Sequence, residues 1–238
     1  MLRRLFVLSY APNGMWAYLL STWFLARRDE GGNLDDGELY GFLRYITGFI
    51  YAYSLERPGV NALRGPVYPA LIDIVNGRDA DFSAHLFDRE TITGRFRSYQ
   101  FTNQRRFTRS MLVWWAYSDP DQPLMDLDTT LEIEHIYARK RNEVHPLADR
   151  SNLEALGNKA MLEKRVNIRA ADYQLADKRK YYEGYTNDKG AEVPGTAMRE
   201  LVEIARRGDF TEANIEERTE KIIAVFVDWL GELGLLRE

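Results

Sequence analysis

Two of the three histidines of this chain lie between Thr130 and Tyr182, together with its densest run of basic residues. At the start of this stretch, Glu132, Glu134 and His135 stand in a segment that alternates apolar and polar residues. Such alternation predicts a short β-strand with one buried face. An imidazole titrates near neutral pH and can take a proton from water once a partner fixes its tautomer. His135 is therefore a candidate general base.

The residues that follow supply the other groups that phosphodiester hydrolysis needs. The segment 156–162 predicts a second short strand, on which Asn158 could be the partner of His135. Glu134 and Asn167 offer hard oxygen ligands, which suit Mg²⁺ or Mn²⁺ and leave coordination positions open for water and phosphate. A helix is predicted over 172–183, with Asp172 as its cap. The predicted order is strand, strand, helix.

These separated pieces resemble the HNH nuclease domain (His-Me finger, ββα-metal) found at the C-terminus of GmrSD-type, modification-dependent restriction enzymes. The resemblance rests on these residues: Glu134-His135-Ile136, Leu156-Gly157-Asn158 with Leu162, Asn167, Leu175, Lys178 and Tyr182, and more weakly Ile215, Arg218 and Trp229. It implies that His135 is the general base, oriented by Asn158, and that Glu134 and Asn167 bind the metal. Tyr137-Ala138 replaces a proline of the family pattern and Leu175 replaces a phenylalanine, which concerns packing around the site.

Charge is distributed unevenly along the chain. Its formal net charge is −4, yet the stretch from Arg139 to Tyr182 holds eleven Lys or Arg against six Asp or Glu. Contact with a nucleic-acid backbone requires a local positive face, and a basic protein overall is not needed. A solvated face is the alternative for each basic run. Beside the nuclease-like motif we expect DNA contacts from the following residues: Arg139, Lys140, Arg141, Lys159, Lys164, Arg165, Lys178 and Arg179.

Composition narrows the class of protein. The 238 residues are 45% hydrophobic and include no cysteine, which indicates a folded chain without disulfides or cysteine-bound zinc. No segment has the length of a membrane span or the pattern of a signal peptide, so we expect a cytoplasmic protein with no membrane partner. The apolar start of the chain suggests a piece of a longer protein. The resemblance implies that an N-terminal, nucleotide-dependent (NTPase) DNA-sensing domain precedes it there.

Apolar periodicity predicts that the rest of the chain is helical, with helices over 15–28, 35–56, 66–77, 108–118, 196–207 and 211–235. The expected fold class is α+β and mostly α-helical, with a helical body enclosing a small ββα-metal (HNH-like) module. The Pro/Asp-rich segment 119–123 is the best domain boundary. The expected parts are a helical region (1–123), the nuclease module (124–190) and C-terminal helices (191–238) that pack on the helical body.

The leading hypothesis is a DNA endonuclease or nickase that depends on Mg²⁺ or Mn²⁺ and acts as the effector of a type IV-like restriction or phage-defence protein. Its substrate would be double-stranded DNA, modified or not. The alternative is a catalytically inactive module that keeps the ββα shape and binds nucleic acid or protein. The other histidine of this stretch, His145, precedes Pro146. This position is more typical of a solvent-facing loop than of a phosphate contact.

Overall fold

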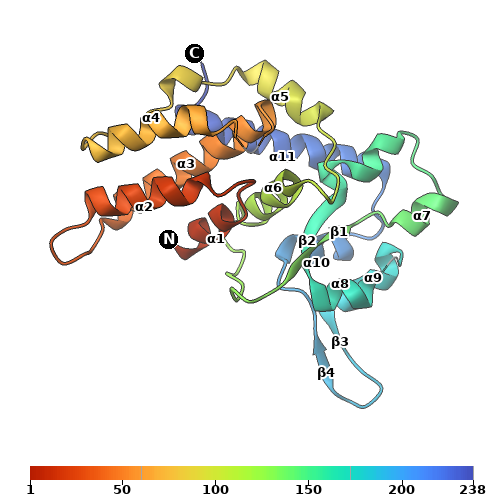
Figure 1. The fold of residues 1–238 in the computed structure, drawn as a ribbon. Coiled ribbons are helices and arrows are strands. Elements are labelled where there is room, and N and C mark those ends of the chain that lie inside the picture. Colours follow the sequence, from red (N-terminus) through yellow and green to blue (C-terminus); the bar gives the residue numbers. More distant parts are fainter. Residues whose placement is uncertain (60, 172, 238) are drawn as a thin grey trace. The chain divides into compact units, whose positions relative to one another are not determined.

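The computed structural model describes residues 1–59, 61–171 and 173–237 (Figure 1). The chain divides into two compact units, one formed by Met1–Tyr99 with Ile223–Glu238 and the other by Gln100–Ile222. The division does not fall at the Pro/Asp-rich segment 119–123. The helix Arg106–Ala116 (α6) precedes that segment but packs against the strand Lys159–Glu163 (β2), and so it belongs to the second unit.

The first unit is helical. Its elements are α1 (Leu2–Ser9), α2 (Met15–Arg27), α3 (Asp36–Glu56), α4 (Arg64–Val75), the 3₁₀ turn η1 (Ser83–His85), α5 (Arg89–Ser98) and the second half of α11 (Glu212–Glu232). Helix α3 begins where Asp35 accepts a hydrogen bond from the backbone N–H of Glu38, as expected of an N-cap. The predicted stripe from Leu39 to Tyr53 is buried along α3.

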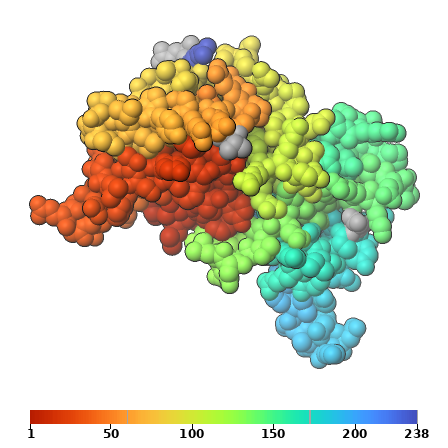
Figure 2. Space-filling view, viewed as in Figure 1, coloured from red at the N-terminus to blue at the C-terminus, as the bar shows by residue number. Residues whose placement is uncertain are grey.

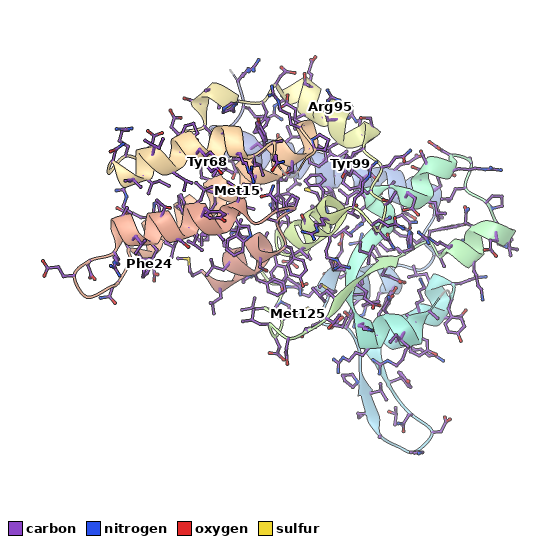
Figure 3. All side chains as sticks on the ribbon, in the orientation of Figure 1. Met15, Phe24, Tyr68, Arg95, Tyr99 and Met125 are labelled. Atoms are coloured by element: carbon purple, nitrogen blue, oxygen red, sulfur yellow. The ribbon has the colours of Figure 1, made fainter. Side chains whose placement is uncertain are left out.

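Helices α2 and α4 lie where periodicity predicted them. On α2, Leu19 and Trp23 of the apolar stripe are buried as expected, whereas Phe24 of the same stripe is exposed (Figure 3). On α4 the buried residues are Pro66, Val67, Ala70 and Ile74, while Ile72 and Tyr68 face solvent. These two helices are apolar on several sides, so the choice of buried face depends on how they pack against each other.

The second unit contains both small sheets. Its elements are α6, β1 (Leu131–His135), α7 (Arg139–Val144), η2 (Arg150–Glu154), η3 (Leu156–Asn158), β2, α8 (Lys164–Ala170), α9 (Leu175–Glu183), β3 (Gly184–Thr186), β4 (Glu192–Pro194), α10 (Arg199–Arg206) and the first half of α11. β1 pairs with β2 and β3 with β4, both antiparallel. The β3–β4 hairpin, which the sequence indicated as a loop, stands out from the surface of this unit (Figure 2).

The strand–strand–helix order holds with two corrections. The second strand begins at Lys159, because 156–158 form the 3₁₀ turn η3. Two helices, α8 and α9, follow it where one was predicted. The predicted capping residue Asp172 lies outside the described residues. Mostly helical structure with two small antiparallel sheets is therefore confirmed, whereas enclosure of an HNH module by the helical body remains a prediction.

Among the described residues, no helix combines the length and the apolar character that crossing a membrane requires.

Candidate nuclease site

The two faces of the β1–β2 pair carry different candidate residues. His135 stands opposite Lys159 in the register, and Glu134 stands opposite Ala160. Because successive side chains of a strand point to opposite faces, His135 shares one face with Lys159 while Glu132 and Glu134 share the other. The pairing thus separates the candidate base from the two carboxylates of its own strand.

His135 ends β1 in a buried position, with 8% of its surface exposed. Its ring atom Nε2 lies 3.5 Å from Oε1 of Glu154 and has no hydrogen bond within the described residues. Burial, together with the nearby Lys159 ammonium, lowers the pKa of His135 from 6.5 to about 4. The imidazole is therefore neutral at pH 7, as a general base must be.

The low pKa of His135 predicts how stability depends on pH. A histidine whose pKa is lower in the folded state than in the unfolded state binds more protons when the protein is unfolded. The free energy of unfolding therefore decreases as the pH falls from 6.5 to the folded-state pKa of about 4. Between pH 7 and pH 5 we expect a loss of about 2 kcal/mol from this group. Urea unfolding of wild type and of His135→Gln at pH 7 and at pH 5 measures this loss of stability. The variant should lose less stability over this interval, and equal losses would contradict a depressed pKa.

Asn158 holds the backbone that follows His135. Its Oδ1 accepts from the N–H of Tyr137 at 2.7 Å, and its Nδ2 donates to the carbonyls of Tyr137 and Leu153. The backbone carbonyl of Asn158 also accepts from the N–H of Ile136. None of these hydrogen bonds involves the imidazole of His135. Asn158 therefore closes the turn after β1 and fixes the position of His135 through the main chain.

Glu134 forms a buried group with two residues of α9. Its Oε1 accepts hydrogen bonds from the Lys178 ammonium and from the Tyr182 hydroxyl, the latter at 2.8 Å. Lys178 also donates to the carbonyl of His135. A divalent cation on this carboxylate would face an ammonium group in contact with the same oxygen, so Glu134 does not fit the expected role of metal ligand. It fits a structural role, which joins α9 to the end of β1.

Asn167 lies beside Glu132 instead. Its Nδ2 donates to Oε2 of Glu132 at 2.8 Å, and Lys164 lies 4.0 Å from the other oxygen of the same carboxylate. Both side chains are partly exposed. No group of three or more His, Asp or Glu side chains converges as a metal site among the described residues. Glu132 and Asn167 are two partly exposed neighbours that carry hard oxygen atoms.

The eight basic residues expected on DNA divide by burial. Lys159 and Lys178 lie inside the unit, 0% and 1% exposed, and both ammonium groups are hydrogen-bonded there. Arg141 is mostly covered, because it stacks on Tyr137 and pairs with Asp209. The buried residues cannot present a charge to phosphate. The exposed ones are Arg139, Lys140, Lys164, Arg165 and Arg179.

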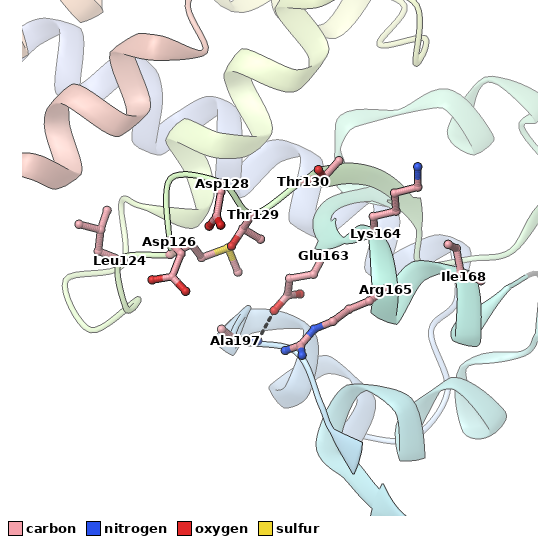
Figure 4. Close-up of a pocket in the computed structure, with 11 residues that line it drawn as sticks. Leu124, Asp126, Asp128, Thr129, Thr130, Glu163, Lys164, Arg165, Ile168 and Ala197 are labelled. Atoms are coloured by element: carbon pink, nitrogen blue, oxygen red, sulfur yellow. Dashed lines mark hydrogen bonds between the residues drawn. The ribbon is translucent and has the colours of Figure 1, made fainter. Parts of the chain in front are cut away.

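Lys164 and Arg165 begin α8 at the edge of an open cavity of about 710 Å³ (Figure 4). Asp126 and Asp128 line the same cavity, and Glu163 beneath it accepts from the N–H of Ala197 at 2.8 Å. The two basic side chains therefore reach solvent beside a hollow that contains charges of both signs.

We predict that Lys164→Ala combined with Arg165→Ala weakens DNA binding in a salt-dependent way. If both residues contact phosphate, the slope of log affinity against log salt should flatten by about two units. The matched control is Arg199→Ala, because Asp119 and Asp121 already neutralise that guanidinium. Binding titrations at several salt concentrations give the slope. An unchanged slope in the double variant would remove α8 from the DNA interface.

The start of β2 is anchored by α11. Arg218, 7% exposed, donates to the carbonyls of Leu156, Gly157 and Lys159 and pairs with Glu200. A Cβ on Gly157 would lie 2.0 Å from the carbonyl oxygen of Ile215, so only glycine allows this approach. The Ile215 and Arg218 positions of the motif therefore hold the strand pair that carries His135.

One neighbour of the site was absent from the sequence-based prediction. Glu154 faces His135 only because the loop 136–158 folds back, and nothing in the local sequence indicates that contact. Glu132 was placed on the predicted strand but given no role, although the strand alternation puts it on the same face as Glu134. His145 is exposed at the end of α7, in line with the solvent-facing interpretation.

Comparison with known proteins gives one family. The model of the family described as GmrSD restriction endonucleases, C-terminal domain, matches residues 85–225, which is more than half of the chain and includes the whole β1–α9 region. Comparisons with curated proteins and with solved structures give no match. The resemblance seen in the sequence is therefore confirmed, and the chain belongs to the C-terminal domain family of the GmrSD restriction endonucleases, a family of nucleases.

Proposed function

We propose that this chain is an HNH-type endonuclease or nickase that hydrolyses DNA with the help of a divalent metal ion. The observation that carries the proposal is the arrangement around His135. This residue ends β1, is neutral at pH 7, and is followed by a turn that Asn158 closes on three backbone groups. Membership of a restriction endonuclease family supplies the reaction class.

In the proposed reaction, His135 takes a proton from the water whose oxygen attacks the phosphorus. The bond from phosphorus to the leaving oxygen then breaks, and that oxygen takes a proton from solvent. A positioned base of this kind contributes about two to four orders of magnitude in rate. Before substrate binds, the imidazole of His135 has a pKa of about 4 and is a weak base. The negative charge of a bound phosphodiester would raise that pKa toward neutrality and strengthen the base.

The cation is part of the proposal, as Mg²⁺ or Mn²⁺. When bound, such an ion absorbs charge on the phosphate. Its candidate ligands in this chain are Glu132 and Asn167, which are both partly exposed and adjacent, since the Asn167 amide nitrogen donates to Oε2 of Glu132 at 2.8 Å. Glu134, which the motif suggested, is committed to Lys178 and Tyr182.

The wider setting follows from the family. We propose that the substrate is double-stranded DNA, modified or not, and that the chain acts in the cytoplasm as the effector of a restriction or phage-defence protein. An N-terminal NTPase or DNA-sensing domain would control it. The five exposed basic residues support a backbone-directed, sequence-tolerant contact with DNA.

One observation favours the alternative, a module that binds DNA or protein without cutting. Among the described residues no cluster of three acidic or histidine side chains forms a ready metal site. The two functions differ in a single measurement, because only a nuclease converts supercoiled plasmid to nicked or linear DNA.

The test is therefore plasmid cleavage with Mg²⁺, with Mn²⁺ and with EDTA. We expect cleavage with either metal and none with EDTA. Direct titration with Mn²⁺ should show an affinity at least about tenfold lower for Glu132→Gln than for wild type, since the variant loses a ligand oxygen. The exposed Glu143 provides the control, Glu143→Gln, which should bind Mn²⁺ as wild type does. Tight DNA binding without cleavage under all three conditions would support the non-catalytic module.

A further inference from the structure

Glu154 lies at the centre of a charged group on the His135 face of the sheet. Its Oε2 accepts from the Lys159 ammonium, and its Oε1 accepts from Arg139 at 2.9 Å. The same Oε1 lies 3.5 Å from Nε2 of His135. One carboxylate thus faces two cations and the candidate base, although it lies in the connection between the two strands, 19 positions after His135 and 5 positions before Lys159.

Lys159 fixes this carboxylate from the buried side. The lysine side chain is 0% exposed, and its ammonium also donates to the carbonyl of Phe101 and to Oδ1 of Asn103. With three acceptors around it, the ammonium has no freedom to turn away. Oε2 of Glu154 is therefore held in place, and Oε1 is left on the side of His135.

The imidazole needs such a partner. Nε2 of His135 is enclosed and has no hydrogen bond within the described residues, and an enclosed polar atom without a partner is costly. A carboxylate can only accept hydrogen bonds when it is ionised. The ring nitrogen that faces it must then carry the hydrogen, because two acceptors would repel each other. A movement of a few tenths of an ångström would turn the 3.5 Å approach into a hydrogen bond.

We propose that Glu154 is a positioning residue of the nuclease, which holds His135 as the Nε2–H tautomer and leaves Nδ1 as the atom that takes the proton from water. The catalytic part of this inference rests on the proposed function. The sequence had assigned orientation of the imidazole to Asn158, but the side chain of Asn158 is bonded to the backbone of the turn. Asn158 sets where His135 stands, and Glu154 sets which nitrogen bears the hydrogen.

The tautomer can be read directly in the folded protein by ¹⁵N NMR with labelled histidine, without DNA or metal. The chain has three histidines, so a His85→Gln, His145→Gln background leaves the signals of His135 alone. We expect the Nε2–H pattern at pH 7. A folded protein with the Nδ1–H pattern would overturn the proposal, whether or not the protein cuts DNA.

A second variant tests whether Glu154 causes the tautomer preference of His135 and whether this preference affects kcat. Glu154→Met combined with Lys159→Met removes both charges of the buried pair, which avoids leaving the lysine without a partner. We expect the Nε2–H preference to be lost and kcat to fall by about 10- to 100-fold, with KM unchanged. An unaltered tautomer with wild-type kcat would show that Glu154 does not position His135. The NMR result is independent of cleavage, so failure of the positioning role and failure of the nuclease function are distinguishable.

Discussion

Replacing His135 with alanine should slow plasmid cleavage by about two to four orders of magnitude, the share that a positioned general base contributes. The physical reason is that the attacking water would lose its proposed proton acceptor, while the residues proposed to bind DNA and metal stay intact. Affinity for DNA and for Mn²⁺ should therefore remain close to wild type. Single-turnover cleavage rates, measured beside binding titrations, check both halves of the prediction.

His145→Ala is the matched control for this experiment. It makes the same change at an exposed histidine after α7, and we expect cleavage within a few-fold of wild type. Higher metal concentration should not rescue His135→Ala, because the substitution leaves the proposed metal ligands Glu132 and Asn167 unchanged. Asn167→Ala should respond differently, since a weakened ligand set is partly compensated by more metal or by Mn²⁺ in place of Mg²⁺. Equal rescue of the two variants would contradict this division of roles.

Glu134→Gln should destabilise the second unit by about 3–5 kcal/mol, the usual cost of removing one partner of a buried ion pair. Lys178 is 1% exposed and Glu134 4%, so the ammonium would be left in the interior facing a neutral amide. Tyr182, fully buried, would face the same amide. Urea unfolding at pH 7 measures the change. The expected result is a lower transition midpoint for the region that contains β1 and α9.

Two further variants make this prediction specific. Glu132→Gln makes the same substitution two residues earlier on β1, where the carboxylate is partly exposed, and should cost less than about 1 kcal/mol. Glu134→Gln with Lys178→Met removes the whole ion pair and should recover most of the lost stability. If Glu134→Gln and Glu132→Gln unfold at the same urea concentration, the Glu134–Lys178 pair does not stabilise the unit, and a ligand role for Glu134 becomes open again.

Local sequence patterns predicted much of the secondary structure. The alternation from Leu131 to His135 predicts β1, and the stripe from Leu39 to Tyr53 predicts α3 together with its buried positions. In β1 the alternation did not predict burial, because Glu134 on the expected polar face is buried and Ile133 is only half-buried. Leu175 and Tyr182, seven positions apart, are both buried on α9 as their spacing indicated. The pattern was weaker where a helix is apolar all round, and so the buried face of α4 could not be predicted.

The family could also be identified from the sequence, since the motif pieces keep a characteristic order and spacing. The spacing of the motif did not predict which partner each charged group has. Lys159 and Lys178 have the composition of DNA-binding residues, yet both are buried. Apart from Glu154, five positions before Lys159, their acceptors lie 56 to 58 positions from Lys159 and 43 to 44 positions from Lys178, and no local pattern records such contacts.

By itself the sequence determined which chemical groups are present, which of them share a strand face, and to which family the chain belongs. Only the tertiary structure decided that Glu134 is neutralised by Lys178, that Asn158 binds backbone, and that Glu154 faces His135. The physical reason is that residue type fixes what a group can donate or accept, whereas its pKa and its role depend on burial and on neighbours that loop closure brings together.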